Sequence, residues 1–173
     1  PRPPSRGAAR RWIAHAGVDW DALVRAYVAE HPPAGWSVPH LGERFADWLA
    51  ARRATDARLP PGIEAVTDLA WTRFLVRTAP DGPAFEVRHY PVDAVALTRT
   101  LLAGQQPDPG GPVTVVVYRH VEHGRVHTLP ASLGTIAALV MNGGGALVGP
   151  LAALGAEAVS QARQDLIARG VLA

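Results

Sequence analysis

The stretch VTVVVY, Val113 to Tyr118, decides the fold class of this 173-residue chain. Its β-branched residues predict a strand. Arg125 to Leu129 is expected to pair with it, because His123-Gly124 suits a two-residue hairpin turn between the two strands. Three short helical stretches follow, at residues 132–141, 149–154 and 157–168. The order strand, strand, helix, turn, helix, turn, helix is typical of a winged helix-turn-helix, and Gly170 is expected to end the last helix.

Upstream of this region the sequence predicts a helical domain over residues 18–80. Asp19 is a candidate N-cap, and the apolar residues after it recur at helical spacing until His31-Pro32-Pro33 ends the helix. Two further helices are expected, at residues 39–53 and 63–78. The alternating segment Phe85 to Tyr90 then predicts a strand, and Asp93 is a candidate cap for a short helix after it.

These segments predict an α+β protein in three parts. Residues 1–17 have the composition of a flexible arm rich in Arg and Pro, residues 18–80 form the N-terminal helical domain, and residues 84–173 form the winged-helix-like C-terminal domain. The segment 104–112, GQQPDPGGP, is the best candidate for a linker within the last part.

The composition excludes several classes of function. The chain has no Cys, which excludes thiol nucleophiles, thiolate zinc sites and iron–sulfur clusters. All 17 basic residues are Arg, so a lysine Schiff base is also excluded. Four of these Arg lie in the first eleven residues, and the remainder of the chain has 13 Arg against 15 acidic residues. No apolar run reaches the length of a membrane span and no signal peptide is recognisable, so we expect a cytoplasmic protein.

Few residues carry catalytic or metal-binding chemistry. With His123-Gly124 as the turn, His120 and His127 would face each other across the hairpin, where two imidazoles could hold zinc or iron. A metal site needs further ligands, so a solvent-facing polar pair is the alternative, and we predict neither a metal nor another cofactor. No Ser lies in a nucleophile elbow and no catalytic carboxylate pair is evident, so the chain is not expected to be an enzyme.

Two kinds of binding suit a winged-helix-like domain. A DNA-binding transcriptional regulator would place the last helix in the major groove, but Arg163 and Arg169 there are offset by two acidic residues. A peptide binder would instead accept an extended peptide on an open strand edge. Charge favours the peptide over nucleic acid, and the regulator is the alternative. The candidate peptide-binding residues are Val115, Val117 and Arg119 on the strand edge, with Arg163 and Leu166 on the adjoining helix.

Several short motifs resemble those of one family. They are LVRAYVAEHPP at 23–33, LGERFADWL at 41–49, LPP at 59–61, VTDLA at 66–70, RHYPV at 88–92 and VVVYR at 115–119. From about residue 20 onward the chain is similar to the accessory proteins of multinuclear non-haem iron oxidative enzymes in ribosomal-peptide maturation, a family that includes the methanobactin-type partner.

The resemblance implies an accessory role. Such partners are not catalysts: they form a heterodimer with the iron enzyme, a TIM-barrel protein, and help it to accept a ribosomally synthesised precursor peptide. The resemblance further implies that the C-terminal half binds the leader of the precursor peptide as an added strand, and that the helical half helps to dock the enzyme.

Overall fold

The structure, a computed structural model, describes residues 5–32, 42, 44–80 and 84–173 and has a mixed α+β fold. Its elements are α1 (Ser5–His15), α2 (Trp20–Glu30), α4 (Phe45–Arg53), α5 (Ile63–Thr78), β1 (Ala84–Tyr90), α6 (Ala94–Ala103), β2 (Val113–Arg119), β3 (Val126–Pro130), α7 (Leu133–Asn142), the 3₁₀ turn η1 (Gly149–Leu151) and α8 (Ala156–Ala168). Within the described part of the chain, no helix combines the length and the apolar character needed to cross a membrane.

The chain divides into two compact units, and both are discontinuous in sequence. The first unit comprises Pro1–Trp71 and Tyr90–Val113, and the second comprises Thr72–His89 and Thr114–Ala173. The expected division after residue 80 therefore differs from the structure, because most of β1 belongs to the second unit and α6 belongs to the first.

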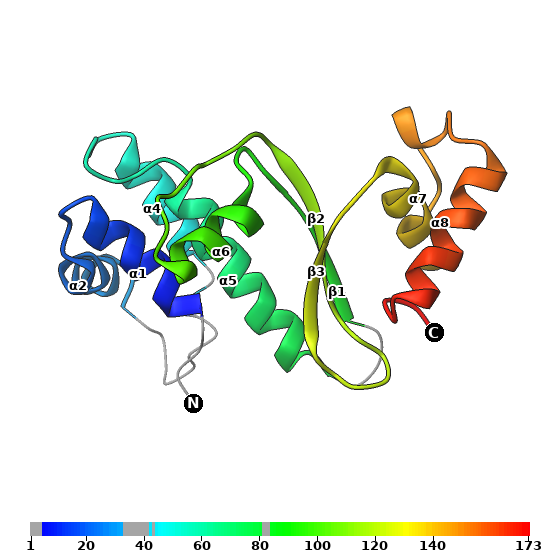
Figure 1. Cartoon of the computed structure of the whole chain (residues 1–173), viewed down its shortest axis with the longest axis horizontal. Coiled ribbons are helices and arrows are strands. Elements are labelled where there is room, and N and C mark those ends of the chain that lie inside the picture. The colour runs from blue at the N-terminus through cyan, green and yellow to red at the C-terminus, as the bar shows by residue number, and fades with distance from the viewer. Residues whose placement is uncertain (1–4, 33–41, 43, 81–83) are drawn as a thin grey trace. The chain divides into compact units, whose positions relative to one another are not determined.

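The N-terminal segment is a helix in the core of the first unit, so the flexible arm expected at residues 1–17 is wrong for its described residues. α1 lies beside α6 (Figure 1), and Arg11 donates a hydrogen bond to the Leu102 carbonyl of α6 at 3.0 Å. The buried residues of α1 are Ala8, Ala9, Trp12 and Ile13. The Arg and Pro content of this segment concealed an apolar stripe that a helix gathers on one face.

Two aspartates cap helices of the first unit as the sequence predicts. Asp19 accepts the backbone N–H groups two and three residues further on at 2.9 and 3.2 Å, and Asp93 accepts the equivalent groups of α6 at 3.1 and 2.8 Å. The Asp93 N–H itself donates to the Pro109 carbonyl at 2.8 Å. The segment 104–112 is therefore irregular chain attached to the first unit rather than a free linker.

Aromatic side chains join α2 to α4. The Tyr27 ring lies 4.8 Å from the Phe45 ring and 5.5 Å from the Trp48 ring, and Trp48 Nε1 donates to Glu30 at 2.7 Å. Edge and tilted contacts of this kind suit the charge distribution of aromatic rings. The first residues of the helix expected at 39–53 lie outside the described residues, which show α4 from Phe45 onward.

The second unit is built on a three-stranded antiparallel sheet in the order β1-β2-β3. In the β2–β3 pair, Tyr118 lies opposite His127, and the His120 N–H donates to the Arg125 carbonyl at 2.9 Å. The hairpin loop therefore has four residues, 121–124, and the expected two-residue turn is wrong. The pairing differs from the expected one by two residues, which leaves every side chain on its expected face.

The sheet of the second unit is covered on both faces. One face packs against α7 and α8, which lie side by side (Figure 1). Towards the other face, Arg73 of α5 donates to Thr128 Oγ1 at 3.2 Å. The buried residues of the core between sheet and helices are Val116, Tyr118, Ala137, Ala138, Leu139, Val159, Leu166, Val171 and Leu172.

The segment between α7 and α8 departs from the expected helix at 149–154. Only Gly149–Leu151 is helical, as one 3₁₀ turn with Pro150 near its start. Glycines at 149 and 155 bound the segment, so too few residues remain to offset the cost of nucleating an α-helix.

The chain after α8 packs against the β2–β3 hairpin. Gly170 has a φ of +67° and follows the end of α8, as the sequence predicts. Its carbonyl accepts the Val121 N–H at 2.9 Å, and Val171 and Leu172 then enter the core. A Cβ at Gly170 would overlap the His120 ring, so both the backbone conformation and the available space require glycine.

The burial of α1 gives a first prediction. Replacing Trp12, which is 5% exposed, by Ala should lower the free energy of unfolding by about 3 kcal/mol or more, because the cavity adds to the lost apolar burial. Replacing Arg10, whose exposed guanidinium lies 3.5 Å from Asp21, by Ala should change it by less than about 1 kcal/mol. Equal and small effects of both substitutions in denaturant unfolding would show that α1 does not stabilise the unit.

A second prediction compares two glycines. Gly124 shares the φ of +67° of Gly170, but nothing lies within 4 Å of a Cβ built on it. Gly124→Ala should lower the free energy of unfolding by about 1 kcal/mol, because the left-handed backbone conformation alone is unfavourable for Ala. Gly170→Ala should lower the free energy of unfolding clearly more, because it also displaces the His120 ring. Thermal unfolding of the two variants measures the difference. Equal losses of stability would contradict the packing of His120 against Gly170.

Candidate functional site

The structure places Val115, Val117 and Arg119 in the central strand of the sheet, so the open edge expected there is wrong. Neighbouring residues of a strand direct their backbone groups to opposite sides. Since the His120 N–H bonds to Arg125 across the hairpin, the backbone N–H and C=O groups of the even-numbered residues of β2 point to β3. Those of the odd-numbered residues point to β1. The chain's own β1 therefore occupies the edge that a peptide was expected to join, and Val115 and Val117 are fully buried.

The side chain of Arg119 is also engaged within the second unit. Its guanidinium donates to the carbonyls of Ala79 and Pro80 at 2.7 and 2.6 Å. These bonds tie the chain that follows α5 to the end of β2. Arg119 thus bonds two backbone carbonyls, one partly buried and one exposed, and a ligand that recruits its guanidinium would have to break both bonds.

The outer edge of β3 offers a few unpaired backbone groups. Its register directs the N–H groups of Val126 and Thr128 away from β2. Pro130 has no N–H to offer, and Arg73 reaches the Val126 carbonyl at 3.5 Å. The edge that could receive a peptide strand is therefore short and partly occupied.

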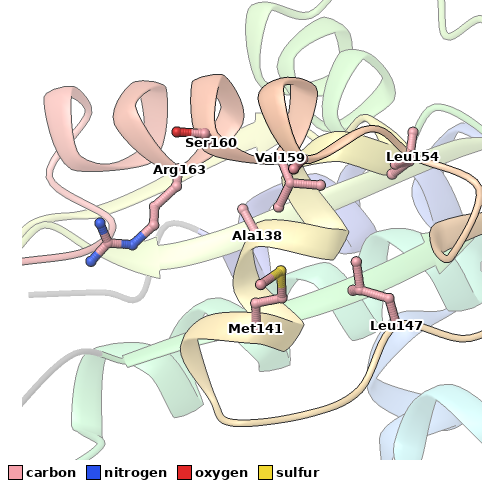
Figure 2. A pocket seen from close by; sticks show the side chains of 8 residues that line it. Ala138, Met141, Leu147, Leu154, Val159, Ser160 and Arg163 are labelled. Atoms are coloured by element: carbon pink, nitrogen blue, oxygen red, sulfur yellow. The ribbon is translucent and has the colours of Figure 1, made fainter.

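The helices of the second unit enclose a largely apolar groove with a volume of about 400 Å³. Figure 2 shows Met141 and Leu147 on one side of it and Val159 on the other, with the Arg163 side chain at one end. Met141 is 54% exposed, so the groove is open to solvent at this rim. The lining residues are Ala138 and Met141 of α7, Leu147 and Leu154 of the connecting segment, and Ala156, Val159, Ser160 and Arg163 of α8.

Helical spacing brings these side chains together. Positions 156, 159, 160 and 163 of α8 are separated by three, four and seven residues and share one face of the helix, as positions 138 and 141 do on α7. The glycine-rich turn after α7 returns Leu147 to the groove. A Cβ at Gly145 would lie 2.8 Å from Val140 Cγ1, so the tight return requires a residue without a side chain.

Only one of the two predicted α8 residues can reach a ligand. Arg163 is exposed and lines the groove, as a contact residue should. Leu166 is 2% exposed and belongs to the core between α8 and the sheet, so its predicted contact with a peptide is wrong. The two residues are three positions apart on α8, so their side chains point about 60° apart, Arg163 towards the groove and Leu166 towards the sheet.

Three histidines gather at the β2–β3 hairpin. The rings of His120 and His123 stack with centroids 3.7 Å apart, and the His127 ring lies 6.1 and 5.4 Å from them. Among the residues that the structure describes, no group of three or more His, Asp or Glu side chains has an arrangement that could hold a metal ion. The rings of His120 and His127, which were expected to face each other across the hairpin, lie 6.1 Å apart, and the residue opposite His127 is Tyr118.

The apolar residues of the groove were not singled out from the sequence. Met141 and Leu147 flank the Asn-Gly-Gly-Gly turn, and Val148 beside them is 70% exposed. The sequence does contain a signal for this site. Large apolar side chains cluster next to a glycine-rich turn, in a short domain with few aromatic residues. Large exposed apolar side chains that gather in one place indicate a binding surface.

Comparisons of this chain with protein-family models, with curated proteins and with solved structures find no match.

Proposed function

We propose that this chain is a non-catalytic partner subunit that binds a ribosomally synthesised precursor peptide and presents it to an iron-dependent, TIM-barrel peptide-modifying oxidase. The single observation that supports peptide binding most strongly is the solvent-open apolar groove between α7 and α8 with Arg163 at its end. The role beside an iron enzyme rests on the motif resemblance. The winged-helix-like character of the second unit is part of the same proposal.

The groove suits the side chains of a peptide better than a small polar metabolite. Met141, Leu147 and Val159 supply apolar contact area, and the flexible thioether of Met141 adapts to side chains of different shape. Among the described residues, Arg163 is the only charged one in the lining, so a carboxylate next to the apolar residues of the peptide would complement it. Peptides that bind helix-lined grooves insert apolar anchor residues, which the lining of this groove can accept.

The groove is a better site than the edge of the sheet. β2 is closed on both sides, and β3 presents only two outward N–H groups before Pro130. Strand addition gains its affinity from a row of backbone hydrogen bonds, which this short edge limits. The proposed peptide is therefore held mainly by its side chains in the groove, and this revises the strand-addition mode that the resemblance implies.

The charge on α8 disfavours the alternative, a DNA-binding regulator. Glu157 and Asp165 accompany Arg163 on this helix and Arg169 directly after it, and the Gln161 amide donates to Asp165 at 3.1 Å instead of being free to read a base. Arg119 is held by two backbone carbonyls. A DNA-binding helix needs several cations that can reach phosphates, since phosphate contacts supply most of the affinity.

A third prediction tests the groove with random peptides displayed on phage and selected on the purified full chain. Wild type should enrich peptides with two or more apolar residues close to Asp or Glu. Met141→Glu should abolish the enrichment, because it places a carboxylate among apolar lining residues. Arg163→Glu should replace the acidic preference by a basic one, as expected for direct charge complementarity.

Matched variants make this selection decisive. Arg169→Glu changes the same charge at the residue directly after the same helix, outside the groove lining, and should keep the wild-type preference. No enrichment on wild type, or unchanged enrichment on Met141→Glu and Arg163→Glu, would refute peptide binding in the groove. Tight binding of mixed-sequence duplex DNA with a steep salt dependence that Arg163→Ala and Arg169→Ala weaken would support the regulator instead.

A fourth prediction distinguishes groove binding from strand addition. Thr128→Pro removes an outward N–H of β3, whereas Thr128→Val keeps this N–H and loses only the hydroxyl that Arg73 contacts. Affinity for a selected peptide, measured by fluorescence polarisation, should be similar in both variants. A loss of tenfold or more in Thr128→Pro alone would show that the peptide pairs with β3.

The partnership with the enzyme needs its own test. Affinity purification of the tagged full chain from its native host should recover an iron-containing TIM-barrel enzyme in stoichiometric amount, identified by mass spectrometry and iron analysis. Recovery of the chain alone, or with nucleic acid, would refute the accessory role while leaving the peptide selection to be judged separately.

A further inference from the structure

The tip of the β2–β3 hairpin has an unusual pair of side-chain to backbone hydrogen bonds. His120 Nδ1 accepts the N–H of Glu122 at 3.2 Å, and His123 Nδ1 accepts the N–H of Arg125 at 3.2 Å. In each case the ring bonds the backbone two residues further on, as an Asx turn does. Together they hold the four-residue loop in its conformation.

These bonds exist only while the rings are neutral. An imidazole nitrogen that accepts a hydrogen bond carries no proton, so the neutral ring carries its hydrogen on Nε2. Protonation of His123 puts a hydrogen on Nδ1, which then repels the Arg125 N–H instead of accepting it. The same proton places a full charge next to the stacked ring of His120, whose centroid is 3.7 Å away.

The surroundings of His123 also favour its neutral form. Desolvation of its ring beside His120, and then the positive charges of His120, His127 and Arg125, lower the pKa of His123 below its ordinary 6.5, while Glu122 partly offsets them. From the C-terminal segment, the residue against the His120 ring is Gly170, which carries no charge, and Arg169 before it is exposed. Arg73 of α5 bonds to Thr128, whose side chain lies on the opposite face of β3 from His127.

The hairpin tip is joined directly to the end of the chain. The His120 ring fills the space beside Gly170, and the Val121 N–H donates to the Gly170 carbonyl at 2.9 Å. Val171 and Leu172, which follow, are buried in the same core as Leu166 of α8. A change in the loop that moves His120 or Val121 therefore loosens the attachment of this segment.

We propose that His123, stacked on His120, is a proton-sensitive latch that fastens the C-terminal segment Gly170–Leu172 to the β2–β3 hairpin when neutral and releases it when protonated. This device lies outside the groove and does not depend on the proposed peptide-binding function.

The direction of the pH dependence follows from the bonds. The released loop binds a proton on His123 more readily than the latched loop, so the latch is fully stabilising above the ordinary pKa of about 6.5 and weakens as the pH falls below it. Above this pH the segment should be protected, and towards about pH 5 it should open.

The test is an NMR titration of the ¹⁵N-labelled full chain from about pH 8 to about pH 5. The amide signals of Val121, Arg125, Gly170 and Val171 should shift together with one midpoint below 6.5. Exchange of the Val121 amide with solvent should accelerate at least several-fold beyond its intrinsic pH dependence as the bond to Gly170 is lost.

Three variants separate the causes. In His123→Asn the side-chain carbonyl takes the place of Nδ1 and accepts the Arg125 N–H without titrating, so the concerted shift should disappear while the loop keeps its structure. His120→Asn keeps its own turn bond but removes the ring beside Gly170, so Val121 should exchange rapidly at every pH. His15→Asn, an exposed substitution in the first unit, should titrate like wild type.

Two results would overturn the latch. One is a wild-type titration in which Val121 and Gly170 do not respond between about pH 8 and about pH 5. The other is a His123→Asn titration that matches wild type at these amides, which would assign the response to another group.

Discussion

The second unit depends on the complete burial of β2. Val115, Val116 and Val117 are consecutive and each is fully buried. Since successive side chains of a strand point to opposite faces, three buried neighbours require cover on both faces of the sheet. Their backbone groups must also be paired on both sides, because unpaired polar groups cannot be buried without large cost. β1 and β3 pair with the two edges of β2, while α7 and α8 cover one face of the sheet.

This constraint determines where the unit can bind a ligand. A strand with both edges paired offers no backbone to an incoming peptide, and Arg119 at its end is committed to the carbonyls of Ala79 and Pro80. The open apolar surface lies instead between α7, α8 and the segment that connects them, where α8 turns one face to the sheet and an adjacent face to the groove. Leu166 turns inward to the sheet core, whereas Ala156, Ser160 and Arg163 turn to the groove, with Val159 between the two.

Features set by local chemistry could be predicted from the sequence. Asp19 and Asp93 cap helices, the valine run forms a strand, and Gly170 ends α8, because each outcome depends on a few adjacent residues. The hairpin turn was predicted with the wrong length, since a two-residue change in pairing keeps each side chain on its face and hydrophobic pattern alone cannot distinguish the registers.

Features set by distant parts of the chain could not be predicted. Nothing near Val113 reveals that β1, which precedes α6, will pair with β2 and close its edge. The composition of residues 1–17 suggested a disordered arm, but α6 gives the apolar stripe of α1 a surface to bury against. At the groove, Arg163 was identified because it is a cation on the last helix. Met141 and Leu147 were missed because only the glycine turn brings them to α8.

Two of the motifs that carry the family resemblance, VTDLA and RHYPV, contact each other in the first unit. The Tyr90 hydroxyl of RHYPV donates to Asp68 of VTDLA at 2.8 Å, and a Cβ at Gly62 would lie 2.7 Å from Val92 Cγ2. These residues join helix α5 to the chain that enters α6, so their role is in the packing of the first unit. A resemblance based on them is an argument about fold. The case for peptide binding therefore depends on the groove of the second unit, whose lining residues can be changed without disturbing this packing.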